Sequence, residues 1–141
     1  MRIAYSTDEV TPLTEAIAAT LGQWGHHVDQ VGAGDEWPEV GRRVGEAVAG
    51  GRADLGVVWC FTGTGVSIAA NKVPGVRAAL CVDATTASGA RRWNDANVLA
   101  LSLRVTAPTV AEEIVRAFLQ TEVDPAERAA IGRVEPSRIG S

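Results

Sequence analysis

The chain has 141 residues, of which 46% are hydrophobic and 21% are charged, and its net charge is −4. This balance predicts one water-soluble domain and excludes a disordered chain or a fibrous repeat. No apolar stretch reaches the roughly 20 residues of a membrane helix, and no basic tract suits nucleic acid. Two cysteines and two adjacent histidines give neither a disulfide framework nor a convincing metal site. We therefore expect a cytoplasmic protein without metal or cofactor.

Strand and helix patterns alternate along the chain. The apolar run 2–6 predicts a strand, and a helix with Pro12 in its first turn follows as far as Gly25. A second strand is predicted over 27–31, a second helix over 37–49, and a fully apolar strand over 55–60. The remaining predicted elements are a helix beginning near Ser67, a strand at 77–82, a helix over 86–92, a strand at 98–102 and an amphipathic helix over 109–120.

Such alternation is typical of a doubly wound α/β fold, in which a five-stranded parallel sheet lies between two layers of helices. Functional groups in this fold gather at the carboxyl ends of the strands. His26 and His27 precede a strand, so we expect them at the opposite edge. We predict one domain over 1–123 and a C-terminal arm, 124–141, that packs on a neighbouring subunit, with Arg128 and Arg138 as surface charges.

The segment 60–67, Cys-Phe-Thr-Gly-Thr-Gly-Val-Ser, lies between a buried strand and a helix. Its glycines let backbone N–H groups converge, and the helix dipole adds positive potential, so an anion or a developing oxyanion is favoured there. A thiol beside a helix N-terminus is partly ionised, which makes Cys60 a candidate base. The alternative is a buried structural cysteine beside a tight turn. The dinucleotide-binding fingerprint is absent because its third glycine is missing.

The string from Thr62 to Lys72, which contains Ser-Ile-Ala-Ala-Asn-Lys, resembles the signature of the ribose-5-phosphate isomerase type B and galactose-6-phosphate isomerase family. The resemblance continues through 75–81, 94–99 and Arg104, and covers nearly the whole chain. It implies a flavodoxin-like fold and an aldose–ketose isomerase that moves a proton between adjacent carbons through an enediolate. It also implies a sugar or sugar phosphate as substrate, and a homodimer or tetramer with shared active sites.

The resemblance also assigns roles to individual positions. Cys60 becomes the base, and Thr62 assists proton transfer. The remaining roles are binding roles: the backbone of Gly63, Thr64, Gly65, Val66 and Ser67 holds the enediolate oxygen, Asp8 and Asn94 bind sugar hydroxyls, and Arg104 and Arg133 match cations around a substrate phosphate.

Several positions depart from the family pattern. Glu9 stands where the family has a histidine, which disfavours a phosphate there and leaves either a ligand-facing carboxylate or a solvated charge. Trp93 replaces the histidine that opens the sugar ring. Indole has no basic lone pair, so Trp93 is either a wall for the ligand or simple core packing. Phe61 replaces a glycine, and the basic cluster before Arg133 is thinned.

Two of the assigned residues also have simpler interpretations. Asp8 can be a helix cap, and Arg104 can be an ion-pair residue. Three functions are consistent with these patterns. The first is a divergent isomerase that acts on an open-chain or otherwise atypical substrate. The second is a subunit that requires a related partner chain to supply the absent histidine, and the third is a sugar-binding or anion-binding protein without turnover.

Overall fold

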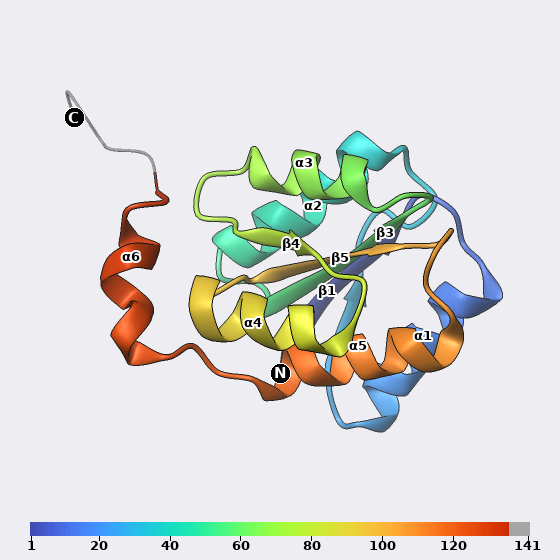
Figure 1. The fold of residues 1–141 in the computed structure, drawn as a ribbon. Helices are drawn as coiled ribbons and strands as arrows, with labels where there is room; N and C mark the ends of the chain where they lie inside the picture. Colours follow the sequence, from blue (N-terminus) through green and yellow to red (C-terminus); the bar gives the residue numbers. More distant parts are fainter. Residues whose placement is uncertain (136–141) are drawn as a thin grey trace.

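The computed structural model describes residues 1–135 and shows a parallel sheet between two layers of helices (Figure 1). The strands are β1 (Arg2–Thr7), β2 (His27–Gln30), β3 (Leu55–Cys60), β4 (Ala78–Leu80) and β5 (Val98–Ser102), in the spatial order β2-β1-β3-β5-β4. The helices are α1 (Pro12–Gln23), α2 (Trp37–Ala49), α3 (Thr64–Asn71), α4 (Ala84–Asn94), α5 (Pro108–Gln120) and α6 (Arg128–Gly132), with a 3₁₀ turn, η1 (Pro125–Glu127), before α6. The predicted flavodoxin-like α/β class is confirmed.

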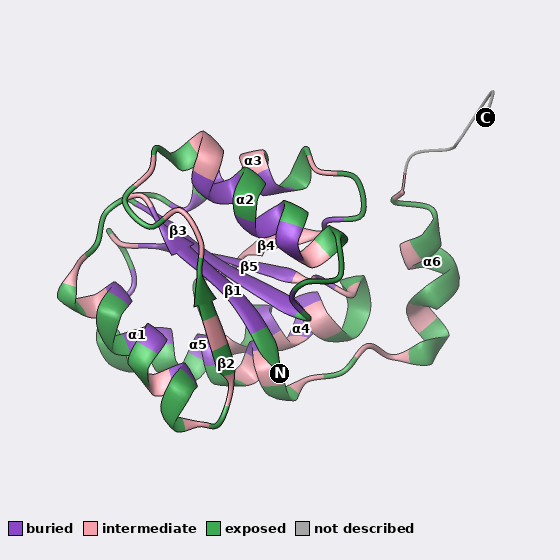
Figure 2. Cartoon of the chain, turned by 180° about the vertical axis from the view of Figure 1, so that it is seen from behind, coloured by how far each residue is buried: buried purple, intermediate pink, exposed green. Residues whose placement is uncertain are grey.

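Each face of the sheet has its own hydrophobic core. Helices α1, α4 and α5 cover one face, where Ile17, Ile114 and Phe118 pack on Tyr5 and Trp59. Helices α2 and α3 cover the other face with side chains that include Val40, Val44 and Val66. The central strands are buried throughout while the outer helix surfaces are exposed (Figure 2). Burial on both faces explains why β3 and β5 consist almost entirely of apolar residues.

Local signals in the sequence determine where the helices begin. Thr11 caps α1, because its hydroxyl accepts from the Thr14 N–H at 3.1 Å while the Thr14 hydroxyl accepts from the Thr11 N–H at 2.9 Å. Pro12 then occupies the first helical turn, as predicted. Asp83 caps α4 by accepting from the Thr86 N–H at 2.7 Å. This contact lowers the pKa of the Asp83 carboxyl.

The bounds of three predicted elements were wrong. Helix α3 begins at Thr64 rather than near Ser67, because Gly63 adopts a φ of +80° and lets the helix start directly after the turn. Helix α4 spans 84–94 rather than 86–92, since the Asp83 cap extends its start and Asp95, with a φ of +48°, ends it. Strand β4 covers only 78–80 of the predicted 77–82, because it lies at the edge of the sheet and pairs with β5 alone.

The helices that connect the parallel strands run back against the strand direction, so the sheet has two chemically different edges. We call the edge where strands end and helices begin the carboxyl edge, and the opposite one the amino edge. After β1 the chain continues to β2 on one side of the sheet, and after β3 it continues to β4 on the other side. Ligands of such sheets bind between β1 and β3, where this direction reverses. His27 begins β2 and His26 lies 3.1 Å from the N-terminal amine, so both are at the amino edge, as predicted.

The described part of the C-terminal arm, residues 124–135, stands away from the sheet and holds no buried residue in η1 or α6. It lies beside the end of α4, at the amino edge (Figure 1). Residues 136–141 of the expected arm, including Arg138, lie outside the described residues. Packing of this arm on a second subunit stays a prediction. In the described part of the chain, no helix combines the length and the apolar character that crossing a membrane demands.

Candidate functional site

The turn after β3 brings the Cys60 thiol beside the start of α3. Cys60 is the last residue of β3, and its sulfur accepts a hydrogen bond from the Gly63 N–H at 3.2 Å. This N–H group lies at the positive end of the α3 dipole. Cys60 is only 4% exposed, whereas the sequence predicts a thiol at the lip of the site. This burial matches the alternative interpretation of a buried cysteine beside a tight turn.

Gly63 makes this turn possible. Its φ of +80° is unfavourable for any residue with a side chain, and a Cβ there would lie 3.0 Å from the carbonyl carbon of Leu101. The chain therefore passes close against β5 before α3 begins. The first N–H groups of a helix have no acceptor in a preceding turn, so those of Thr64 and Gly65, which are not buried, are available to an anion. Val66 is fully buried as a whole residue, so its N–H is not open to solvent in this structure, contrary to the predicted binding role.

The other residues of the 62–67 segment lie at the surface beside this turn. Thr62 and Thr64 are exposed, and their hydroxyls are 2.8 Å apart. Ser67 is half-buried in the first turn of α3, where its N–H donates to the Gly63 carbonyl at 3.3 Å. The hydroxyl pair and the helix start together form a polar rim next to Cys60.

Asp8 and Glu9 follow β1, the strand beside β3. The Asp8 N–H donates to the Trp59 carbonyl at 3.3 Å, which places Asp8 next to the strand end that carries Cys60. Burial raises the pKa of the Asp8 carboxyl, and the charge of Glu9 raises it further. The Glu9 side chain is exposed, while its carbonyl accepts from the Thr7 hydroxyl at 2.6 Å. Neither carboxylate caps α1, because Thr11 does so, and the helix-cap interpretation of Asp8 was therefore wrong.

Phe61 and Arg104 form the outer side of this edge. The Phe61 carbonyl accepts from the Arg104 N–H and the Ser102 hydroxyl, both at 2.9 Å, which fixes the turn against β5. The Phe61 ring is 58% exposed, and the Arg104 guanidinium lies 6.0 Å from its centroid. Within the described residues Arg104 has no carboxylate partner, so the ion-pair interpretation is not supported. Its charge is available to a ligand.

The structure does not bring all predicted site residues together. Trp93 and Asn94 end α4, and Arg133 lies in the arm, so these three are at the amino edge. Asp8, Cys60 and Arg104 are at the carboxyl edge. The residues just before and just after β5 are six strand steps apart, which is roughly 20 Å. One small sugar cannot reach both groups within a single chain.

Trp93 is not a core residue, which corrects one of its two interpretations. The indole is 53% exposed and lies flat against its own helix over Gly89, where a Cβ would come within 2.7 Å of the ring. Asn94 is also exposed, and it lines a hollow of about 560 Å³ together with Lys72, Arg77 and the end of the described arm. The amino edge therefore presents an aromatic face and an amide side by side.

Trp37 is a further residue at the carboxyl edge that the sequence analysis treats only as a helix start. Its indole is 45% exposed and packs over Gly65, where a Cβ would lie 2.9 Å from two ring atoms. It thus forms a wall beside the start of α3. Its position directly after the loop that follows β2 was a usable signal, because such loops end at the carboxyl edge.

The loops at the carboxyl edge carry more acids than bases. Asp8, Glu9, Asp35, Glu36 and Asp83 all follow strands, and among these loops only the one after β5 contributes a cation, Arg104. A phosphate bound here would therefore need further cations from elsewhere. In the described part of the chain, no three His, Cys, Asp or Glu side chains are grouped to hold a metal ion.

Comparison with known proteins agrees with this fold. Residues 3–135 match the family model described as Ribose/Galactose Isomerase. The chain is 39% identical over 130 residues to the galactose-6-phosphate isomerase subunit LacB of Clostridium acetobutylicum, covering 89% of this chain and 75% of that protein. It is 41% identical over 96 residues to a D-erythrulose-4-phosphate isomerase of Pectobacterium atrosepticum, covering 68% and 63%. A solved ribose-5-phosphate isomerase B of Clostridium thermocellum superposes with a TM-score of 0.89 at 37% identity, covering 95% of each chain.

Proposed function

Because this chain belongs to the ribose/galactose isomerase family, we propose that it is an aldose–ketose isomerase acting on a sugar or sugar phosphate. The observation that carries the proposal is the Cys60 sulfur beside the Gly63 N–H, at the start of α3. A thiolate in this position takes a proton from the carbon next to the substrate carbonyl and returns it to the adjacent carbon. The electron pair stays within the substrate, and the proton passes through the Cys60 thiol, where it can exchange with solvent, so the step needs no redox cofactor.

The backbone at the start of α3 has a defined task in this reaction. Removal of the proton places negative charge on the carbonyl oxygen and forms an enediolate. In this proposal the N–H groups of Thr64 and Gly65, which lack an acceptor in a preceding turn at the start of α3, donate to this oxygen. Fixed donors of this kind stabilise developing charge without having to reorganise. Thr62 assists proton movement between the two oxygens, and Asp8 accepts from a sugar hydroxyl.

The site is shared between two copies of the chain in this proposal. Trp93, Asn94 and Arg133 are at the amino edge, so they meet Cys60 only if that edge of a second copy docks on the carboxyl edge of the first. Two observations support this arrangement. The two sets of residues lie at opposite edges of the sheet, and the described arm, 124–135, stands away from the rest of the chain (Figures 1 and 2). We propose that this arm reaches the neighbouring copy. Arg133 of the second copy then supplies a cation that the acidic loops around Cys60 lack.

The departures at Glu9 and Trp93 bear on the substrate. A carboxylate at position 9 repels a phosphate at that loop, and an indole at position 93 cannot accept the proton released when a sugar ring opens. The indole favours a substrate that is already open-chain, and the carboxylate favours an anionic group, where present, that is held by Arg104 and Arg133 instead. The named activities of the relatives span erythrulose, ribose and galactose phosphates, so family membership does not define the carbon chain length.

The direct test is deuterium exchange from solvent into a panel of aldoses, ketoses and their phosphates, read by mass. The purified protein should incorporate deuterium next to the carbonyl, and Cys60→Ala should abolish this incorporation while remaining folded. Cys81→Ala is the matched control, because Cys81 is the other free cysteine and is fully buried. Exchange that survives in Cys60→Ala would reject Cys60 as the base.

A second function is favoured by one observation, the exposed indole of Trp93 in place of a basic side chain. The LacB relative is itself named as a subunit, and we infer that a related partner chain is the alternative source of the missing base. This alternative predicts no exchange by the purified chain alone and recovery on addition of the related chain. Full activity of the chain by itself contradicts it.

A further inference from the structure

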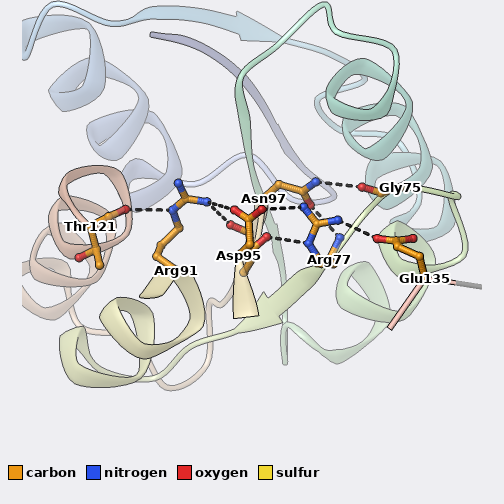
Figure 3. A network of polar contacts seen from close by, with 8 residues as sticks. Gly75, Arg77, Arg91, Asp95, Asn97, Thr121 and Glu135 are labelled. Carbon is orange, nitrogen blue, oxygen red and sulfur yellow. Dashed lines mark hydrogen bonds and ion pairs between the residues drawn. The ribbon is translucent and has the colours of Figure 1, made fainter. Parts of the chain in front are cut away.

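A network of polar contacts at the amino edge joins two segments that each carry a candidate binding residue (Figure 3). One segment is the turn after α4, where Asn94 precedes Asp95. The other is the arm, where Arg133 precedes Glu135. Both segments line the hollow of about 560 Å³ to which Asn94 is exposed. Asn94 and the arm therefore border the same space.

Arg77, just before β4, bridges the two segments. Its Nε donates to the Asp95 carbonyl at 2.8 Å, and its Nη2 lies 3.4 Å from the Asp95 carboxylate. Its Nη1 donates to the Glu135 carboxylate at 2.7 Å. The backbone N–H of Arg77 donates to the side chain of Asn97 at 2.7 Å, so the turn is also held from below. A planar guanidinium can serve both carboxylates at once, whereas a lysine ammonium is a single point charge.

The turn itself has a second support that does not involve the arm. Arg91 donates to the Ala96 carbonyl at 2.5 Å and lies 3.4 Å from the Asp95 carboxylate. Asp95, the only non-glycine residue with positive φ in the described chain, is thus held from both sides. The turn therefore stays in place when the contact to the arm is removed.

The arm, in contrast, depends on few contacts. Near its start the Asp124 N–H donates to the Arg92 carbonyl at 2.9 Å, and at its described end Glu135 pairs with Arg77. Arg133 lies between these two anchors. The Arg77 and Glu135 side chains are only 21% and 37% exposed, so their ion pair is shielded more than an ordinary surface pair.

We propose that Arg77 is a positioning residue that holds the turn carrying Asn94 and the arm carrying Arg133 in one arrangement, so that both reach the same ligand. The ligand role rests on the proposed isomerase function, whereas the tether itself does not. Removing the tether should weaken substrate binding and leave the proton transfer intact, because the tether contacts neither Cys60 nor the start of α3.

The test uses Glu135→Gln and Arg77→Lys in the full chain. Glu135→Gln removes the charge of the tether and keeps both supports of the turn, so the fold is retained. Hydrogen exchange at the amides of 128–134, read by mass, should accelerate about fivefold, and KM for the best substrate should rise about fivefold with kcat within about twofold. Arg77→Lys should act in the same direction. The double variant should be no worse than Arg77→Lys alone, because both changes remove one interaction.

Glu112→Gln is the matched control, since Glu112 forms an exposed ion pair with Arg116 on α5, and it should change neither quantity. Unchanged exchange in Glu135→Gln overturns the tether, and a lower kcat at constant KM overturns the positioning role. If the wild type turns over no sugar, the proposed function fails. The ligand role of the tether is then tested by the dissociation constant of ribose 5-phosphate, measured by calorimetry, in place of KM. An unchanged or absent affinity then overturns the ligand role, while the exchange data still decide the tether.

Discussion

Replacing Tyr5 by phenylalanine should destabilise the protein strongly, because a single hydroxyl joins three elements beneath the candidate site. The Tyr5 hydroxyl accepts from the Trp59 indole N–H at 2.9 Å and donates to the Thr14 carbonyl in α1 at 2.6 Å. Tyr5 is 1% exposed and Trp59 is fully buried, so water cannot replace either contact. Burial raises the pKa of Tyr5, which keeps the hydroxyl protonated and able to donate.

The expected loss follows from these contacts. Phenylalanine fills nearly the same space, so no large cavity term enters. An unpaired buried indole N–H costs about 1–3 kcal/mol, and the lost bond to Thr14 adds about 1 kcal/mol at most. We expect a decrease of about 2–3 kcal/mol in the free energy of unfolding. For a domain of this length this corresponds to a fall in Tm of about 7–10 °C.

Urea unfolding followed by circular dichroism measures the free energy, and calorimetry measures Tm. A double-mutant cycle with Trp59→Phe separates the indole contact from other effects, because the donor is then absent in the background. In that background Tyr5→Phe should cost less by about 1–2 kcal/mol. A loss below about 0.5 kcal/mol in the single variant, or full additivity in the cycle, would refute this account of the buried network.

Three further predictions concern the site. Gly63→Ala should lower the free energy of unfolding in urea by about 1–3 kcal/mol, because Gly63 has a left-handed backbone and lies against Leu101. It should also slow deuterium exchange at the substrate carbon. Wild-type values for both quantities would contradict the proposed turn. Gly89→Ala should push the Trp93 ring off α4 and shift the Trp93 fluorescence. The Trp93 signal is isolated by subtracting the spectrum of a Trp93→Phe variant. An unaltered spectrum would show that the ring does not pack on Gly89. The stability of Asp8→Asn relative to the wild type should increase as the pH rises from about 3 to about 7. The folded-state pKa of Asp8 is raised, so the wild type is more stable when Asp8 is protonated and loses that stability as Asp8 ionises. The asparagine does not ionise and loses nothing. A stability difference that is flat across this range, measured by urea midpoints, would argue against a desolvated carboxylate.

Alternating periodicity in the sequence was sufficient to predict the fold, because strands covered on both faces must be apolar and amphipathic helices must show one apolar stripe. The apolar run of β3 and the Pro12 helix start were located correctly for this reason. The cysteine beside a glycine-rich turn was likewise visible as a local motif. The start of α3 was missed, since a glycine-rich segment does not reveal which glycine adopts positive φ.

The arrangement of the site depended on contacts between residues distant in the sequence. Periodicity does not show that Cys60 is nearly sealed from solvent, that Trp93 lies exposed on Gly89, or that Trp37 packs over Gly65. Nor does it join Arg77 to Glu135, 58 positions later. Local pattern determines an element because its neighbours in sequence are also its neighbours in space. The separation of Asn94 from Cys60 at opposite edges of the sheet follows from the alternation of strands and helices, but contacts between distant segments, such as that of Arg77 with Glu135, arise only when the helices fold back against the strands in the tertiary structure.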